Sequence, residues 1–437
     1  MSRLALFSLL AIFLLAGALL SPLAAQSTLL QGGTIHLPGG ETLEGSVLIA
    51  DGLIQEVGDV QGSADATVDI SGLHVYPGMF NAYTTLGLVE ISSISATVDN
   101  EELGAYSPHL QSATAIHPAS EVIPVTRANG ITHSLVAPGG GVISGQAALI
   151  HLDGWTVEEM ALDVGAGMVM QWPAIQTSRF DFATFSVKTA PYKEAKEKAE
   201  KQVEEIRDWL EAARHYQQAT EGGSERIERN LKLEHLVDVL DRGQLVIVVA
   251  NGKRDIEAAI EFADEEGLRI AIAGGRDAHK VKETLAEKEI PVILGLVGSL
   301  PPNEDDPYDR AYSTMGELVE AGVKVAMGTS APSGGGGGPG GPHGARTLPY
   351  EVAMAVGYGL SRADAIDVLT KNPAEIFGVE DKIGSIEAGK IANLIVTDGD
   401  PLEIMTRVKH VFIGGRDTGL DNKHDALYEK YRARGSR

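Results

Sequence analysis

The feature that most constrains the fold of this chain is a run of alternating strand-like and helix-like segments. The strand-like segments are short apolar runs at 130–136, 245–250, 268–273, 291–295 and 323–327. The helix-like segments that follow several of them lie at 254–266, 280–289 and 315–321. Strand and helix alternate in units of roughly 20 to 25 residues, which is typical of parallel βα units. Several such units in series predict a (β/α)8 barrel, with a doubly wound parallel sheet as the structural alternative.

Further strand-like segments flank this region at both ends of the chain. Residues 43–50 and 51–57 surround an Asp51-Gly52 dipeptide, which is a strong hairpin signal. Residues 391–397 and 408–413 have the same character near the other end. Two sets of strands so far apart in the sequence can pair into one small β-domain. We therefore expect a composite β-domain formed by residues 28–75 and 385–416. A barrel at 76–384 is inserted into it, and residues 417–437 form a C-terminal tail.

The first 25 residues have the pattern of a secretory signal peptide. Arg3 supplies a positive start, residues 4–20 are uncharged and apolar, and Leu23-Ala24-Ala25 resembles a cleavage site. An uncleaved membrane anchor is the alternative, because the apolar run is close to the minimum length that spans a bilayer. We expect cleavage, which predicts an exported protein, periplasmic or extracellular, without stable membrane association.

Composition excludes several classes of partner and chemistry. The chain has no cysteine, so disulfides, thiolate metal sites and cysteine nucleophiles are excluded. Its formal net charge of −24 repels phosphate backbones, and we expect no nucleic-acid partner. Residues 192–220, rich in Glu, Lys and Ala, predict a long exposed helix. The glycine-rich segment 333–344 is either a lid over a ligand site or a loop without function.

A family resemblance appears at residues 76–88, Tyr-Pro-Gly-Met-Phe-Asn-Ala-Tyr-Thr-Thr-Leu-Gly-Leu. This segment is similar to the opening motif of the amidohydrolase superfamily, in which Pro-Gly, two apolar residues, Asp or Asn and one further residue precede His-x-His. Other segments resemble, in order, those of imidazolonepropionases and related exported members: 107–118, 128–138, 139–146, 360–374 and 384–394. The resemblance implies a (β/α)8 TIM-like barrel inserted in a composite β-domain. It also implies hydrolysis of C–N bonds other than peptide bonds, with Zn or another divalent metal as cofactor.

The same resemblance shows which residues stand at the family's catalytic positions. Tyr83 and Thr85 replace the first two histidines, and the positions of the later ligands and of the catalytic aspartate hold Val249, Asn251, Gly274 and Ser330. The bridging lysine aligns near Val169. Zn²⁺ requires three or four converging N, O or S donors, and these side chains are poor neutral donors or offer none. A general base is missing as well. We therefore expect no metal cofactor and no catalysis by the family's usual mechanism.

Two further residues, Arg276 and His279, lie just past a strand end and are candidate ligand contacts. The predicted function is that of a catalytically degenerate amidohydrolase that acts as a binding or partner subunit for a small-molecule ligand. It would form a homo-oligomer or pair with an active relative. Two alternatives stay open: an active hydrolase of cyclic amides or small peptides with a rebuilt site, and a purely structural exported protein. A neutral polar mouth would favour binding, and a collapsed apolar mouth would favour the structural role.

Overall fold

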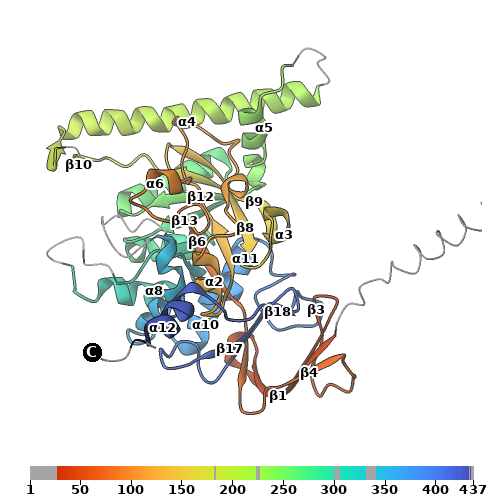
Figure 1. Cartoon of the computed structure of the whole chain (residues 1–437). Coiled ribbons are helices and arrows are strands. Elements are labelled where there is room, and N and C mark those ends of the chain that lie inside the picture. The colour runs from red at the N-terminus through yellow and green to blue at the C-terminus, as the bar shows by residue number, and fades with distance from the viewer. Residues whose placement is uncertain are drawn as a thin grey trace, which may run out of the picture.

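The computed structural model describes residues 27–181, 184–222, 227–298, 301, 306–330, 341–432 and 434 (Figure 1). The predicted signal peptide, most of the glycine-rich segment 333–344 and the end of the predicted tail lie outside the described residues. Within the described ranges, no helix combines the length and the apolar character that a membrane span requires.

One eight-stranded sheet curls into a nearly closed barrel. Its strand order is β15-β14-β13-β12-β9-β8-β7-β6. These strands are β6 (Met79–Thr84), β7 (Ile131–Val136), β8 (Ile143–His151), β9 (Ala161–Gln171), β12 (Val246–Ala250), β13 (Ile270–Gly274), β14 (Val292–Leu294) and β15 (Val325–Met327). The two ends of the sheet meet where the Ser330 N–H donates to the Tyr83 carbonyl over 3.0 Å. The barrel fold class expected from the sequence is confirmed.

The barrel departs from a regular (β/α)8 pattern at β8. This strand pairs antiparallel with both β7 and β9, whereas the other neighbouring pairs in the sheet are parallel. Only residues 137–142 separate β7 from β8. Six residues are too few for the crossover that a parallel neighbour would need. The segment around Gly139-Gly140-Gly141 is therefore a hairpin turn rather than a βα connection.

Alternation along the strands divides the core into an inner and an outer layer. On β12, Ile247 and Val249 belong to the cluster inside the barrel, whereas Val246 and Val248 pack with the helices outside it. This period of two is what a strand buried on both faces requires. The helices that pack against the outer layer are α2 (Val122–Arg127), α6 (Lys253–Glu266), α7 (Lys282–Glu287), α8 (Arg310–Glu320), α9 (Leu348–Val356) and α10 (Arg362–Leu369).

A second eight-stranded sheet is built from both ends of the chain. Its order is β18-β17-β16-β5-β1-β2-β3, with β4 paired to β1. The strands are β1 (Thr28–His36), β2 (Thr42–Ala50), β3 (Leu53–Gly58), β4 (Ala66–Asp69), β5 (His74–Pro77), β16 (Leu394–Thr397), β17 (Val408–Ile413) and β18 (Arg416–Asp417). Strands β5 and β16 pair antiparallel, so the red and blue ends of the chain lie side by side in Figure 1. The exact domain boundaries stay a prediction.

The remaining elements lie around these two sheets. Helix α4 (Tyr192–Glu221) crosses one side of the barrel, next to α5 (Leu231–Val237) and the hairpin of β10 (Ser178–Asp181) and β11 (Ser186–Thr189) (Figure 1). The long helix was predicted from its charge pattern, but one face of it is buried through Ile206, Leu210 and Ala213. The other helices are α3 (Val157–Met160), α11 (Lys371–Ile376) and, within the predicted tail, α12 (Lys423–Arg432).

Candidate functional site

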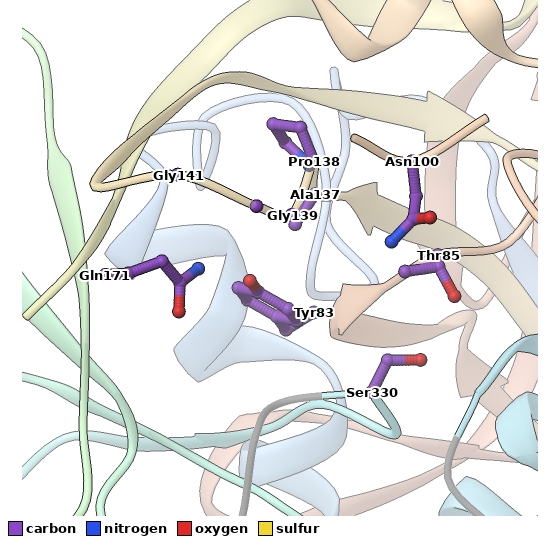
Figure 2. A pocket seen from close by; sticks show the side chains of 10 residues that line it. Tyr83, Thr85, Asn100, Ala137, Pro138, Gly139, Gly141, Gln171 and Ser330 are labelled. Atoms are coloured by element: carbon purple, nitrogen blue, oxygen red, sulfur yellow. The ribbon is translucent and has the colours of Figure 1, made fainter. Parts of the chain in front are cut away.

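A cavity of about 410 Å³ opens at the carboxyl ends of β6, β7, β9 and β15 (Figure 2). The described residues that line it are Tyr83, Thr85, Asn100, Ala137, Pro138, Gly139, Gly140, Gly141, Gln171 and Ser330. We call this cavity the mouth pocket. It lies where (β/α)8 barrels place their functional residues, since the loops after the strands converge there.

Tyr83 forms the centre of the mouth pocket and is only 4% exposed. The β6–β7 register shifts between Asn81 and Thr84, and both Ala82 and Tyr83 belong to the inner core cluster. Residue 328, just after the neighbouring strand β15, is a glycine that packs against the main chain of Tyr83. A Cβ at Gly328 would lie 2.4 Å from the Tyr83 Cβ, closer than two carbon atoms can approach. Glycine at 328 therefore lets the main chain after β15 approach the main chain of β6 closely at Tyr83.

The hydroxyl of Tyr83 is a neutral group. Burial raises the pKa of Tyr83 well above its ordinary value, and a hydrogen bond with Gln171 opposes that rise to a smaller extent. The phenol thus stays protonated at any physiological pH. Gln171 also donates to Ser144 Oγ over 3.4 Å, which helps to orient its amide. Figure 2 shows Gln171 and Gly141 on one side of the Tyr83 ring and Thr85 and Asn100 on the other.

Ser330 reaches the mouth pocket from the loop after β15. Its Oγ is buried and has no hydrogen-bond partner among the described residues. The preceding residue, Thr329, is tied to Asn81 by two bonds: Asn81 Nδ2 donates to Thr329 Oγ1 over 2.7 Å, and the Thr329 N–H donates to Asn81 Oδ1 over 3.1 Å. These two hydrogen bonds join the segment after β15 to β6 and hold the residue before Ser330 in place. A buried hydroxyl without a protein partner is a ready contact for a bound ligand or water.

The described lining of the mouth pocket does not fit a divalent metal. It contains no carboxylate and no imidazole. Across the described ranges, no three His, Asp or Glu side chains come close enough together to hold a metal ion. Protein zinc sites draw on imidazole, thiolate and carboxylate, and catalytic sites also need a base near the bound water. The chemistry available in the pocket is neutral hydrogen bonding from hydroxyl, amide and backbone groups.

Three of the five sequence-predicted mouth residues, Tyr83, Thr85 and Ser330, come together in the pocket, and two lie outside its lining. Asn251 follows β12, where its Oδ1 accepts from the Arg276 N–H over 3.4 Å. Gly274 ends β13 with a φ of 92°, a backbone conformation that favours glycine. Asn251 and Gly274 thus shape the loop after β13 rather than the pocket.

The candidate ligand contacts Arg276 and His279 also lie outside the pocket lining. Arg276 Nε is 3.8 Å from Asp277 Oδ1, in the same loop. Burial and the nearby Arg310 lower the pKa of His279, so its imidazole is the neutral form at neutral pH. Both residues follow β13, as predicted, but that loop is not part of the mouth pocket.

Sequence reasoning did not assign Asn100, Pro138 and Gln171 to the site. Gln171 is the last residue of β9, two residues past the position aligned with the family lysine, so its place at a strand end was a usable signal. Asn100 comes from the long loop after β6, and its carbonyl accepts the Gly139 N–H over 2.6 Å. No local pattern marks that contact, because it depends on how two loops meet.

Comparisons with known proteins agree with this architecture. Residues 210–417 match the model of the Amidohydrolase family. The chain is 26% identical over 411 residues to amidohydrolase tasK of Hapsidospora irregularis, covering 85% of this chain and 39% of that protein. It is 32% identical over 106 residues to an imidazolonepropionase of Syntrophobacter fumaroxidans, covering 24% of this chain and 23% of that protein. The chain thus spans well under half the length of these curated relatives.

Among solved structures, the fold is similar to that of an amidohydrolase from Thermotoga maritima MSB8. The TM-score is 0.75 at 27% identity, and the match covers 90% of this chain and 99% of that chain.

Proposed function

The chain belongs to the amidohydrolase superfamily, and we propose that it is a member that binds a small neutral polar molecule in the mouth pocket without metal-dependent hydrolysis. The proposal assigns to Tyr83, Thr85 and Ser330 the role of ligand contacts in place of catalytic groups. We further propose that it acts outside the inner membrane, on the basis of its signal-like first 25 residues.

The observation that carries the proposal is the neutral, polar and open character of the mouth pocket. Tyr83 is packed among apolar residues of the inner core such as Val249, but the pocket above it keeps a volume of about 410 Å³. A collapsed apolar mouth would instead favour a purely structural protein. Carboxylates buried without a cation would be costly, so a site that works without a metal is expected to carry hydroxyl and amide groups.

The buried Ser330 Oγ also supports ligand binding in the mouth pocket. A hydroxyl buried without a partner costs about 1–3 kcal/mol. A ligand that accepts or donates a hydrogen bond at Ser330 would recover that free energy. The amide groups of Asn100 and Gln171 add donors and acceptors on opposite sides of the Tyr83 ring.

An active C–N hydrolase with a rebuilt site is the alternative. It would need a general base next to the reacting water. The described lining of the mouth pocket offers none, since its side chains are hydroxyls, amides and apolar groups. A role as a partner subunit, in a homo-oligomer or with an active relative, is compatible with ligand binding.

A thermal-shift screen tests the proposal. The probes are small cyclic amides such as hydantoin and 2-pyrrolidone, each compared with a charged analogue of similar size. We expect at least one neutral amide to raise the melting temperature of the wild-type protein. The rise should be lost in Tyr83→Ala and in Ser330→Ala, and it should be kept in Tyr428→Ala, which changes an exposed tyrosine on α12. Stabilisation that survives both pocket changes would place binding elsewhere.

A further inference from the structure

A cavity of about 430 Å³ lies between helices α4 and α6, on the outside of the barrel. Six residues of each helix line it, together with three residues of the segment that follows β9. It has no lining residue in common with the mouth pocket. We call it the α4–α6 cavity.

Side-chain contacts join the two helices on either side of this cavity. Near the start of both helices, Arg254 Nη1 donates to the Tyr192 hydroxyl over 3.3 Å. Further along both, Arg207 Nη1 donates to Glu266 Oε1 over 2.6 Å. The helices therefore run in the same direction, with a contact at each end of the shared stretch. Between these contacts the space stays open, because side chains such as that of Ala258 are too short to fill it.

Much of the lining is apolar and aromatic. The rings of Trp172 and Phe262 pack edge to face, with centroids 5.6 Å apart and an angle of 67° between their planes. Ile175 and Val203 are partly buried and line the same cavity. A volume of several hundred Å³ with apolar and aromatic walls is typical of sites that bind small organic molecules.

The charged residues of the lining carry an excess of negative charge, with five carboxylates and three cations. The cations on α4 already have partners. Lys196 Nζ lies 3.4 Å from Glu200 Oε1. Arg207 binds Glu265, and its Nε lies 3.8 Å from Glu204 Oε1. These lysine and arginine side chains are therefore not available to balance the remaining carboxylates.

Glu261 is the lining carboxylate that pairs with no cation of the described residues. The residues three and four positions away on α6 offer none, since they are Glu257, Ala258, Asp264 and Glu265. The third cation of the lining, Arg254, acts on Asp255 instead. Burial raises the pKa of the Asp255 carboxyl, and Arg276 and Arg254 oppose that rise. A positive charge is therefore missing beside Glu261.

We propose that the α4–α6 cavity binds a small aromatic amine as its ammonium ion. The aromatic ring packs against Trp172, Ile175 and Val203, and the ammonium group lies beside Glu261. The formal net charge of −24 attracts cations to the whole molecule, and the unpaired carboxylate beside an apolar cavity gives them one place. This inference goes beyond the proposed function, because it concerns a different cavity.

The apolar walls decide against a bare metal ion as the occupant. Within the described ranges, no three His, Asp or Glu side chains come close enough to coordinate one. An aromatic amine needs a single carboxylate and an apolar surface for its ring. The α4–α6 cavity offers both.

A ligand-observed NMR titration at low ionic strength tests the inference with three probes of similar size. These are phenethylamine, 2-phenylethanol and 3-phenylpropionate, which carry a positive, a neutral and a negative group. We expect the amine to bind about threefold more tightly than the alcohol, the size of one exposed charge contact, and the carboxylate to bind most weakly. The preference should decrease as salt is added, because exposed charges are screened.

Two variants locate the binding. Glu261→Gln should remove most of the preference for the amine and leave the affinity for the alcohol unchanged. Glu257→Gln is the matched control, since it removes the same charge from the same helix at a residue that pairs with Lys253 outside the lining. Ala258→Leu places a larger side chain in the cavity on a good helix former, and it should weaken both the amine and the alcohol about tenfold or more.

The outcomes separate this inference from the proposed function. Equal binding of the amine and the carboxylate, or an amine preference that persists in Glu261→Gln, would overturn it. Undiminished binding in Ala258→Leu, or no binding of any probe to the wild type, would do the same. Ser330→Ala should change none of these affinities, and a loss in that variant would place the amine in the mouth pocket.

Discussion

Acidification should weaken the junction between the barrel and the second sheet through two histidines that must be neutral. His133 on β7 and His151 at the end of β8 both face Asn393, which directly precedes β16. The Asn393 amide nitrogen contacts His133 Nε2, and it lies 3.2 Å from His151 Nδ1. Asn393 Oδ1 accepts the Gly414 N–H over 2.7 Å, so the amide nitrogen is the donor to both rings. Each ring nitrogen must then be an unprotonated acceptor.

The pKa values follow from this burial. Burial lowers the pKa of His151 from 6.5 to about 4, although Asp153 opposes the shift. Burial, together with the neighbouring His151, lowers the pKa of His133 well below 6.5. As the pH falls, the unfolded chain binds protons before the folded chain does. The stability that these groups contribute is therefore complete above pH 6.5 and is lost as the pH falls toward about 4. For His151 alone the shift corresponds to about 3 kcal/mol.

Urea unfolding measured at several pH values between 6.5 and 4 checks this prediction. The matched variant is His151→Gln, whose side-chain oxygen can still accept from Asn393 but cannot titrate. Its free energy of unfolding should fall less steeply with pH than that of the wild type, by up to about 1.4 kcal/mol per pH unit. His215→Gln, an exposed change on α4, is the control and should follow the wild type. Equal slopes for the wild type and His151→Gln would refute the reasoning.

Three further predictions concern the mouth of the barrel. Gly328→Ala should destabilise the protein by about 2 kcal/mol or more in urea, and Tyr83→Ala should not rescue it, since the clash involves the Tyr83 Cβ and main chain. Asn81→Ala should lower the free energy of unfolding by about 2 kcal/mol, because it leaves buried Thr329 groups unpaired. A decrease below about 0.5 kcal/mol would contradict the contact between Asn81 and Thr329. Elemental analysis of protein purified without chelator should find well under one equivalent of Zn, Mn or Fe per chain, and a stoichiometric ion would refute the proposed metal-free site.

Much of the fold was predictable because it depends on local patterns. The unbroken apolar run at 245–250 indicates a strand buried on both faces, and Asp51-Gly52 predicts the β2–β3 hairpin, where both residues have positive φ. The motif at 76–88 placed Tyr83 and Thr85 at a strand end, where the structure has them. Such signals survive in a single sequence because each is set by residues that are neighbours along the chain.

What only the tertiary structure decided is which strand ends share a cavity. Gln171 and Asn100 reach the mouth pocket, whereas Arg276 and His279, which also follow a barrel strand, do not. The sequence pattern also did not reveal that β8 runs antiparallel to its neighbours, because such a pattern marks strands without identifying their partners. Register shifts, loop crossings and the closure of β15 on β6 determine these outcomes. They depend on contacts between residues far apart in sequence, whose free energy exists only once the barrel has closed.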